Sequence, residues 1–292
     1  MIIVNLMGGL GNQMFQYALG RHLSLLNQTD LLLDFTSLNA ITDLHIKRNY
    51  ELDIFHVQAR QATAKELQPF HRLQHNRMVR VTQRLFPSLF RNYLVNEKTH
   101  AFDPSILASA DHSWLNGFWQ TENYFMQIED VIRQDFEFKP PLSGLNKTLA
   151  EKICACESLS IHVRRGDYTQ PETLAFHGMC SPDYYYKAVE LLSKRATIEQ
   201  LFIFSDDPEW VKEHLKFKLP ATYISHNTGK HSFEDMRLMS LCKHNIIANS
   251  SFSWWGAWLN ANKNKLVVAP DVWIANKQVD SRDVIPLNWI KL

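Results

Sequence analysis

Two adjacent arginines, Arg164 and Arg165, follow a run of alternating apolar residues at positions 159–163. The alternation and the β-branched residues predict a buried strand, and ligands of parallel sheets bind at the carboxyl ends of strands. Guanidinium groups match phosphate oxygens in pairs and stay charged. We therefore interpret the two arginines as a phosphate clamp, with His162 one pleat back on the face of Arg164. A surface ion-pair cluster with Asp167 is the alternative, because structural ion pairs use the same residues.

Two further predicted strands in the second half of the chain also end in polar side chains. Because the carboxyl ends of parallel strands share one edge of a sheet, we expect these side chains to converge with the arginines. Cations beside a serine-bearing helix N-terminus suit a pyrophosphate, and a carboxylate nearby suits the N–H donors of guanine or ribose hydroxyls. The alternative for the acids is capping of the helix that Pro208 opens. The side chains concerned are Asp206, Asp207, Asn249, Ser250 and Ser251.

The predicted strands and helices that must position these groups alternate regularly in the second half of the chain. Short apolar runs are separated by segments of helical length, which predicts a doubly wound parallel α/β sheet. One helix is expected to start after Ser181 as N-cap, with Pro182 at its first position. Another carries three tryptophans that we expect in the core. The predicted strands are residues 159–163, 201–205, 221–225, 245–249 and 265–270.

The N-terminal region has the outline of a nucleotide-binding unit. A predicted strand at residues 2–7 leads into a glycine-rich turn and an amphipathic helix, and a second strand ends at Asp34. Met14 stands where the third glycine of an NAD fingerprint is required, so NAD binding is only an alternative. Gly9 and Gly11 would let backbone N–H groups approach a phosphate or a sugar.

The middle of the chain holds stretches with two interpretations each. Residues 117–125 combine four aromatic rings with amide and carboxylate side chains, which suits a sugar site or a seam between domains. Residues 67–96 contain no acid, and their arginines form either a solvated helical face or a patch on an anionic membrane surface. Two prolines in residues 138–144 predict a linker. The basic residues of the patch are Arg72, Arg77, Arg80, Arg84 and Arg91.

Bulk properties limit the function classes. A length of 292 residues suits about two domains, and a formal charge of +1 argues against nucleic acid as the main partner. Four cysteines are too few for a disulfide framework, and no signal peptide or anchor is visible, which favours the cytoplasm. No set of histidines and carboxylates has ligand spacing, and the arginines supply positive charge, so we expect no metal.

Five motifs stand in the order found in the bacterial α1,2-fucosyltransferases of glycosyltransferase family 11. The chain resembles that family from residue 8 to about residue 270. The motifs are GGLGNQMFQYA (8–18), GFWQTENYF (117–125), HVRRGDY (162–168), FSDD (204–207) and NSSFSWWGAW (249–258).

The resemblance implies an α/β fold of the GT-B type, with two Rossmann-like domains and a cleft between them. Residues 1–140 would form the acceptor-side domain with a helical insert, and residues 145–292 the GDP-fucose-binding domain. The implied reaction is inverting, metal-independent transfer of L-fucose from GDP-β-L-fucose to the 2-hydroxyl of a terminal β-galactoside. It would serve surface-glycan or O-antigen biosynthesis. Apart from the resemblance, the missing anchor favours the cytoplasm, and the membrane-patch interpretation of residues 72–91 would add peripheral contact at the inner membrane.

Family roles transfer to this chain position by position. Arg164 would hold the leaving β-phosphate, and Arg165 would support it. His162 and one of the two acids Asp206 and Asp207 would read guanine. Further groups lining the diphosphate and nucleoside would be Ser250, Ser251 and Phe252.

The base for the acceptor hydroxyl is left open by the sequence. Related α1,6-fucosyltransferases place a carboxylate shortly after a similar motif, which favours Glu172, although residues 170–172 are predicted to form an exposed loop. Asp167 is the second candidate, and a dissociative route with little base assistance is the third. The same residues would also suit a different GDP-sugar-dependent glycosyltransferase, or a non-catalytic module that binds nucleotides or glycans.

Overall fold

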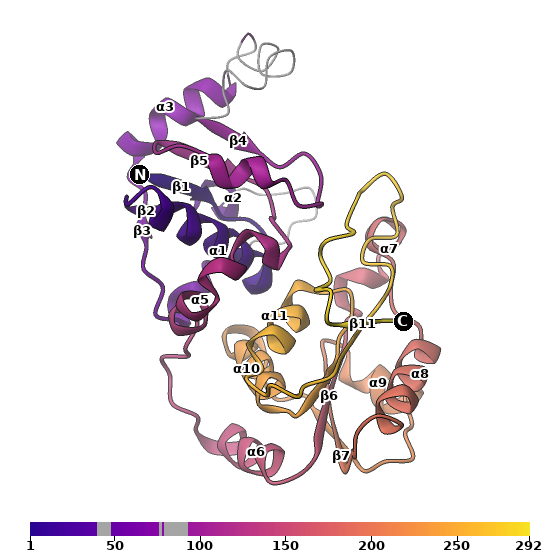
Figure 1. The fold of residues 1–292 in the computed structure, drawn as a ribbon. Coiled ribbons are helices and arrows are strands. Elements are labelled where there is room, and N and C mark those ends of the chain that lie inside the picture. The colour runs from indigo at the N-terminus through magenta and orange to yellow at the C-terminus, as the bar shows by residue number, and fades with distance from the viewer. Residues whose placement is uncertain (40–47, 76–77, 79–92) are drawn as a thin grey trace. The chain divides into compact units, whose positions relative to one another are not determined.

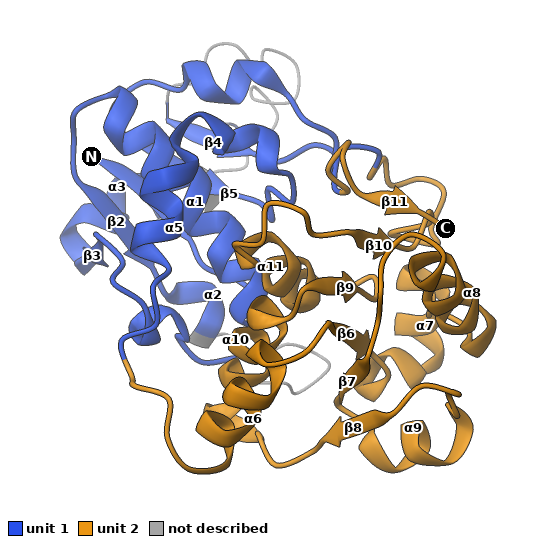
Figure 2. Ribbon diagram, turned by 60° about the horizontal axis from the view of Figure 1, so that its bottom comes forward, with its two compact units in different colours: residues 1–139, 282–284 blue, residues 140–281, 285–292 orange. Residues whose placement is uncertain are grey.

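The computed structural model describes residues 1–39, 48–75, 78 and 93–292. These residues form two compact units, each with its own parallel sheet (Figures 1 and 2). Unit 1 comprises residues 1–139 and 282–284, and unit 2 comprises residues 140–281 and 285–292. The first crossing between the units falls inside the proline-containing stretch 138–144.

Unit 1 contains a five-stranded sheet in the order β3-β2-β1-β5-β4, with every pair parallel. The predicted strands at residues 2–7 and ending at Asp34 are confirmed as its central β1 and neighbouring β2. The strands are β1 Ile2–Asn5, β2 Leu31–Asp34, β3 Arg60–Gln61, β4 Leu94–Asn96 and β5 Ser113–Asn116.

Helices pack on both faces of this sheet because successive strand residues point to opposite sides. Ile3 lies in one apolar cluster with Phe70 of α3, whereas Val4 faces Gly20 of α1, where an added Cβ would lie 2.4 Å from a Val4 methyl. Glycine at that position therefore allows the helix to approach the strand closely. The helical segments are α1 Leu10–Leu26, α2 Thr36–Asn39, α3 Ala64–His75, α5 Glu129–Asp135, η1 Leu52–Ile54, η3 Pro104–Ala108, η4 Glu122–Tyr124 and η5 Met126–Ile128.

Unit 2 contains a six-stranded sheet in the order β11-β10-β9-β6-β7-β8, again parallel throughout. The chain runs outward from β6 to β8, returns to β9 on the other side of β6, and continues to β11. This is the strand order of a doubly wound nucleotide-binding sheet, so that expectation is confirmed, and the switch point lies between β6 and β9. The strands are β6 Ser158–Val163, β7 Gln200–Ser205, β8 Ala221–Ile224, β9 His244–Ile246, β10 Val267–Ala269 and β11 Ile290–Lys291.

The helices of unit 2 cover both faces of its sheet, with α8 and α9 on one face and α6, α10 and α11 on the other (Figures 1 and 2). Ser181 caps α8 by accepting the backbone N–H of Tyr184, as predicted. The tryptophans of α11 are buried, as expected for core residues. The helical segments are α6 Gly144–Cys154, α7 Pro171–His177, α8 Pro182–Ser193, α9 Pro208–His214, α10 Phe233–Leu241, α11 Ser251–Leu259, η6 Gly166–Thr169 and η7 Gly229–His231.

The proposed membrane patch is largely untested by the structure. Arg72 lies on α3 and is exposed. Among the described ranges of the chain, no helix is long and apolar enough to cross a membrane. The remaining arginines of the patch fall outside the described residues; they are Arg77, Arg80, Arg84 and Arg91.

Candidate functional site

The polar residues predicted to converge do so at the carboxyl edge of the sheet in unit 2. Strand β6 lies between β7 and β9, with His162 paired in register to Phe204 and Ile161 to Ile246. The arginines after β6 therefore lie beside the acids after β7. The segment that begins at Asn249 follows β9 on the other side. This edge includes the switch point, where open α/β sheets bind their ligands.

Arg164 lies between two carboxylates. Its Nη2 atom is 2.5 Å from Asp167 Oδ1, and its Nη1 atom is 2.7 Å from Asp206 Oδ2. The side chain remains 27% exposed, and its guanidinium carbon lies 5.3 Å from the ring centroid of Tyr168. The ion-pair alternative from the sequence is thus present in the structure. Because a guanidinium has five N–H donors, two ion pairs leave it capacity for a phosphate.

Gly166 allows the turn after β6 to approach Asp206. A Cβ added at position 166 would lie 2.6 Å from Asp206 Oδ2, which is below any ordinary contact. The same carboxylate accepts the backbone N–H of Arg165 at 2.8 Å through Oδ1. Asp206 therefore ties the backbone of the arginine turn to the guanidinium of Arg164.

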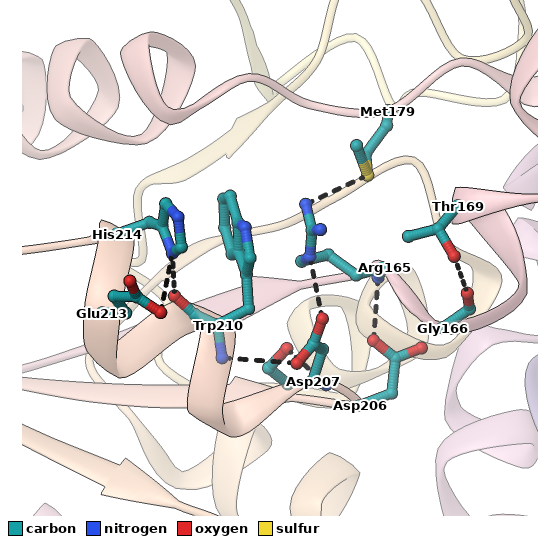
Figure 3. A network of polar contacts seen from close by, with 10 residues as sticks. Arg165, Gly166, Thr169, Met179, Asp206, Asp207, Trp210, Glu213 and His214 are labelled. Carbon is teal, nitrogen blue, oxygen red and sulfur yellow. Dashed lines mark hydrogen bonds and ion pairs between the residues drawn. The ribbon is translucent and has the colours of Figure 1, made fainter.

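Arg165 points into a second set of contacts (Figure 3). Its Nε atom is 3.1 Å from Asp207 Oδ2, and its guanidinium carbon lies 3.6 Å from the Trp210 ring centroid. Asp207 also caps α9 by accepting the backbone N–H of Trp210 at 3.3 Å. The prediction that one of the two acids caps this helix is confirmed for Asp207.

His162 is a buried histidine with an unpartnered nitrogen. The residue is 5% exposed, and within the described part of the chain its Nδ1 atom has no hydrogen-bond partner. Burial and the nearby Arg164 charge lower the pKa of His162 to about 3, so the imidazole is neutral at physiological pH. Its ring centroid lies 5.8 Å from that of Phe252. A neutral imidazole with an unused nitrogen can form a hydrogen bond to a bound base.

The polar residues that follow β9 have two different structural roles. Asn249 donates its side-chain amide to the carbonyl of His177 at 2.9 Å and to that of Gly178 at 3.3 Å, so it fixes the end of α7. Ser250 occupies the N-cap of α11 but makes no side-chain capping bond. Ser251 opens the helix. The amide of Asn249 is thus used within the protein, whereas the two serines stand at a helix N-terminus.

The two candidate bases differ in environment. Asp167 is paired with Arg164. Glu172 is exposed, as predicted, but the predicted loop at residues 170–172 is wrong, because Pro171 opens helix α7 and Glu172 lies in its first turn. Proline is favoured at the first position of a helix, so this signal was present in the sequence.

In unit 1, the glycine turn holds an internal carboxylate. Gly9 is the N-cap of α1, and the next backbone N–H, that of Leu10, donates to Glu51 Oε2 at 2.9 Å. Gly11 lies in the first turn of the helix and is buried. A helix N-terminus attracts anions, and here a side chain from the same unit supplies one.

The aromatic stretch 117–125 contributes to the core of unit 1. Trp119, Tyr124 and Phe125 are at most 2% exposed. Glu97 accepts the backbone N–H groups of Phe118 and Trp119 at 2.7 and 2.9 Å. Burial raises the pKa of Glu97.

Two residues of unit 2 were not singled out from the sequence. Trp210 supports Arg165, and no pattern within α9 indicates this. Burial raises the pKa of Asp235, near the start of α10, to about 7, and its carboxylate accepts a hydrogen bond from Asn227 at 2.7 Å. Asp235 lies in the first turn of α10, where acids are common in helices, so no specific signal for it was present in the sequence. Within the described ranges, no group of three His, Cys, Asp or Glu side chains could hold a metal ion.

Comparisons with known proteins agree over the whole chain. The family model described as "Glycosyl transferase family 11" matches residues 1–292. An α1,2-colitosyltransferase of Escherichia coli is 34% identical, with 100% of this chain and 98% of that protein covered. The O-antigen biosynthesis glycosyltransferase WbnK of Escherichia coli is 36% identical, with 98% and 99% covered.

More distant relatives match either part of the chain or its fold. Human galactoside α-(1,2)-fucosyltransferase 1 is 23% identical over 50% of this chain and 42% of that protein. Among solved structures, the α1,6-fucosyltransferase NodZ soaked with GDP-fucose has a TM-score of 0.51 at 11% identity, covering 88% of this chain and 91% of that one. The likeness supports the α/β fold with two parallel sheets.

Proposed function

Because the chain belongs to glycosyl transferase family 11, we propose that it transfers L-fucose from GDP-β-L-fucose to the 2-hydroxyl of a terminal β-galactoside. The donor class follows from the family, and the finer statement is supported by a relative named for α1,2 transfer and by one named for galactoside α1,2-fucosylation. The acceptor would be part of a surface glycan, since another relative is named for O-antigen biosynthesis. Such a role is compatible with the cytoplasm and with contact at the inner membrane.

The observation that carries the proposal is the juxtaposition of His162 and Arg164 at the switch point. His162 and Arg164 lie two residues apart: the buried neutral imidazole can bind a nucleobase, and the partly exposed guanidinium can bind a phosphate. The N-terminus of α11, with Ser250 and Ser251, starts at the same edge and favours negative charge. A nucleoside diphosphate has both parts.

The mechanism follows from where charge develops. The bond between the fucosyl carbon and the β-phosphate oxygen breaks while the acceptor oxygen bonds to the opposite face of that carbon, so configuration inverts. The leaving GDP gains negative charge, and a fixed cation acts best where charge develops. Arg164 would supply that cation through the N–H donors that its two ion pairs leave for a phosphate, while Asp167 and Asp206 hold the guanidinium in place.

The same cluster offers a base. Asp167 is ion-paired with Arg164, so its carboxylate lies beside the guanidinium that would bind the β-phosphate, and it is the first candidate to accept the proton of the acceptor hydroxyl. Glu172, exposed on α7, is the second candidate. We propose that one of the two acts, and that their alanine variants separate them by the loss of transfer to the acceptor.

For the guanine base, we propose His162 together with one carboxylate. Asp206 and Asp207 were expected in this role, and both are bound to arginines. Asp235 is the third choice, because α10 follows β8, which puts its first turn at the carboxyl edge of the sheet, and because its carboxyl group is bound by the neutral amide of Asn227. Phe252, beside His162, would line the nucleoside.

A second donor is favoured by the similarity to a colitosyltransferase. Colitose lacks the 3-hydroxyl of fucose, so both donors share the GDP part and differ at one hydroxyl. A site that hydrogen-bonds that hydroxyl would discriminate strongly against colitose. NAD binding, the alternative suggested by the N-terminal outline, is not the chemistry of this family.

The test is GDP release from GDP-fucose and from GDP-colitose, with lactose or without it, and with EDTA present in every arm. The proposal predicts lactose-dependent release from GDP-fucose and an α1,2 linkage in the product by NMR. Faster release from GDP-colitose would assign the second donor. GDP binding without release from either donor would favour a non-catalytic module.

A further inference from the structure

The guanidinium of Arg165 is enclosed by protein groups on several sides. Asp207 pairs with its Nε atom at 3.1 Å, and the Nη1 atom lies 3.7 Å from the sulfur of Met179. The indole ring of Trp210 covers one face at 3.6 Å (Figure 3). The side chain is 15% exposed, compared with 27% for Arg164. Arg165 is thus the more enclosed of the two arginines, which suits a supporting role.

Arg165 is linked to Arg164 through one carboxylate. The backbone N–H of Arg165 donates to Asp206 Oδ1 at 2.8 Å, and Asp206 Oδ2 lies 2.7 Å from Arg164 Nη1. The backbone position of Arg165 therefore sets where Asp206, and with it the guanidinium of Arg164, can lie. A displacement of the Arg165 side chain would therefore reach Arg164 through the Arg165 backbone and the Asp206 carboxylate.

We propose that Trp210 is a positioning residue for transfer: its ring fixes Arg165, and through Arg165 and Asp206 it holds Arg164 where the leaving phosphate develops charge. The inference rests on the proposed function, which it deepens by adding the first turn of α9 to the donor site. Trp210 would act through another residue and would not touch the sugar nucleotide.

Trp210 is held both at its backbone and at its ring. Its backbone N–H donates to Asp207, the acid that also binds Arg165, so one carboxylate positions both the start of α9 and the arginine. The imidazole of His214 stacks on the ring with centroids 4.5 Å apart and planes 8° apart. Tryptophan gives the strongest cation–π attraction among the aromatic residues. A ring held in this way provides a stationary support for a guanidinium.

The experiment is a double-mutant cycle on the full chain, with kcat and KM for GDP-fucose measured at saturating lactose. We expect Trp210→Leu to lower kcat by about ten- to hundredfold, because small displacements of a positioned charge cost rates of this size. KM should change by less than about threefold, since most of the nucleotide contacts remain. Trp210→Phe keeps a ring and should retain most of kcat. Arg165→Met with Trp210→Leu should be no slower than Arg165→Met alone.

The control is Lys212→Gln. It removes an exposed ion pair with Glu209 on the same helix, and that ion pair does not involve Arg165, Trp210 or His214. It should leave kcat unchanged. A thermal melt of each variant separates lost positioning from lost folding. If Trp210→Leu does not fold, Trp210→Met provides the same comparison, because it also removes the ring.

Three results would overturn the inference while leaving the function intact. These are wild-type kcat in Trp210→Leu, multiplying losses in the double variant, and an equal loss in Lys212→Gln. Failure of the proposed function looks different. The wild-type chain would then release no GDP from GDP-fucose, and the positioning role would fall with the reaction it serves.

Discussion

Arg164 and Asp206 join the ends of two neighbouring strands: Nη1 and Oδ2 are 2.7 Å apart, across the junction of β6 and β7. The pair places a cation at the ligand-binding edge of the sheet and holds it there. A bound phosphate would therefore meet a guanidinium whose position is already fixed, which is the arrangement that stabilises developing charge best.

Arg164→Ala should lower kcat for transfer from GDP-fucose by about 10²–10³-fold, the cost of losing one preorganised group at a developing charge. Steady-state kinetics at saturating donor measure this. Arg195→Ala, which removes an exposed arginine on the amino-terminal side of β7, is the matched control and should retain wild-type kcat. Equal activity of the two variants would refute the role of Arg164.

Gly166→Ala should disable the site through a single methyl group. Its Cβ would lie 2.6 Å from Asp206 Oδ2, so the carboxylate must move away from Arg164. We expect a loss in kcat of about tenfold or more. Thr169→Ala removes only the hydrogen bond to the Gly166 carbonyl and should cost much less. A Gly166→Ala enzyme with full activity would show that the close approach is dispensable.

His162 should make folding stability depend on pH. Its pKa is about 3 in the folded chain and about 6.5 when unfolded. Between these values the unfolded state binds the extra proton, so stability falls as pH drops through that window, by up to about 1.4 kcal/mol per pH unit. Urea denaturation at pH 7 and pH 5 should therefore give a smaller decrease for His162→Gln than for the wild-type chain. Identical decreases would mean that the imidazole is not buried in neutral form.

Asp235 offers a test of base recognition. Burial raises its pKa to about 7, so the folded chain holds a proton that the unfolded chain releases above about pH 4. Stability should fall as pH rises from about 4 to 7, and Asp235→Asn should remove that part of the decrease. If the carboxylate accepts guanine N–H groups, the variant should also weaken GDP binding much more than UDP binding in calorimetry. If the variant weakens GDP and UDP binding equally, Asp235 does not recognise guanine, and Asp206 or Asp207 is the candidate for that role.

The parallel sheet of unit 2 could be predicted from the sequence, and so could the convergence of the polar residues that follow its strands. Alternation in β6 and the apolar run of β7 predicted two buried strands, and parallel topology then required Arg164 and Asp206 to share an edge. Contacts between residues of separate elements could not be predicted, because they depend on tertiary packing. The contact of Arg165 with Trp210 joins two separate elements, and the Glu51 carboxylate reaches the start of α1 from a separate segment. The raised pKa of Asp235 arises from burial, which no local pattern encodes.

The loop prediction at Glu172 failed for a different reason. Pro171 and Glu172 are common in exposed loops, but they are equally suited to the first turn of a helix, where proline needs no hydrogen bond and an acid meets the helix dipole. Tertiary contacts at the other end decide the matter, because Asn249 holds the carbonyl of His177 at the end of α7.

Calorimetry with GDP and GMP, on the wild-type chain and on Arg164→Ala, decides whether Arg164 binds the β-phosphate of a guanine nucleotide. We expect the wild-type chain to prefer GDP over GMP by at least about tenfold, because a charge-assisted bond is worth about 1.5–3 kcal/mol. Arg164→Ala should lose this preference while binding GMP as before. An undiminished preference for GDP in Arg164→Ala would contradict the assignment of Arg164 to the phosphate.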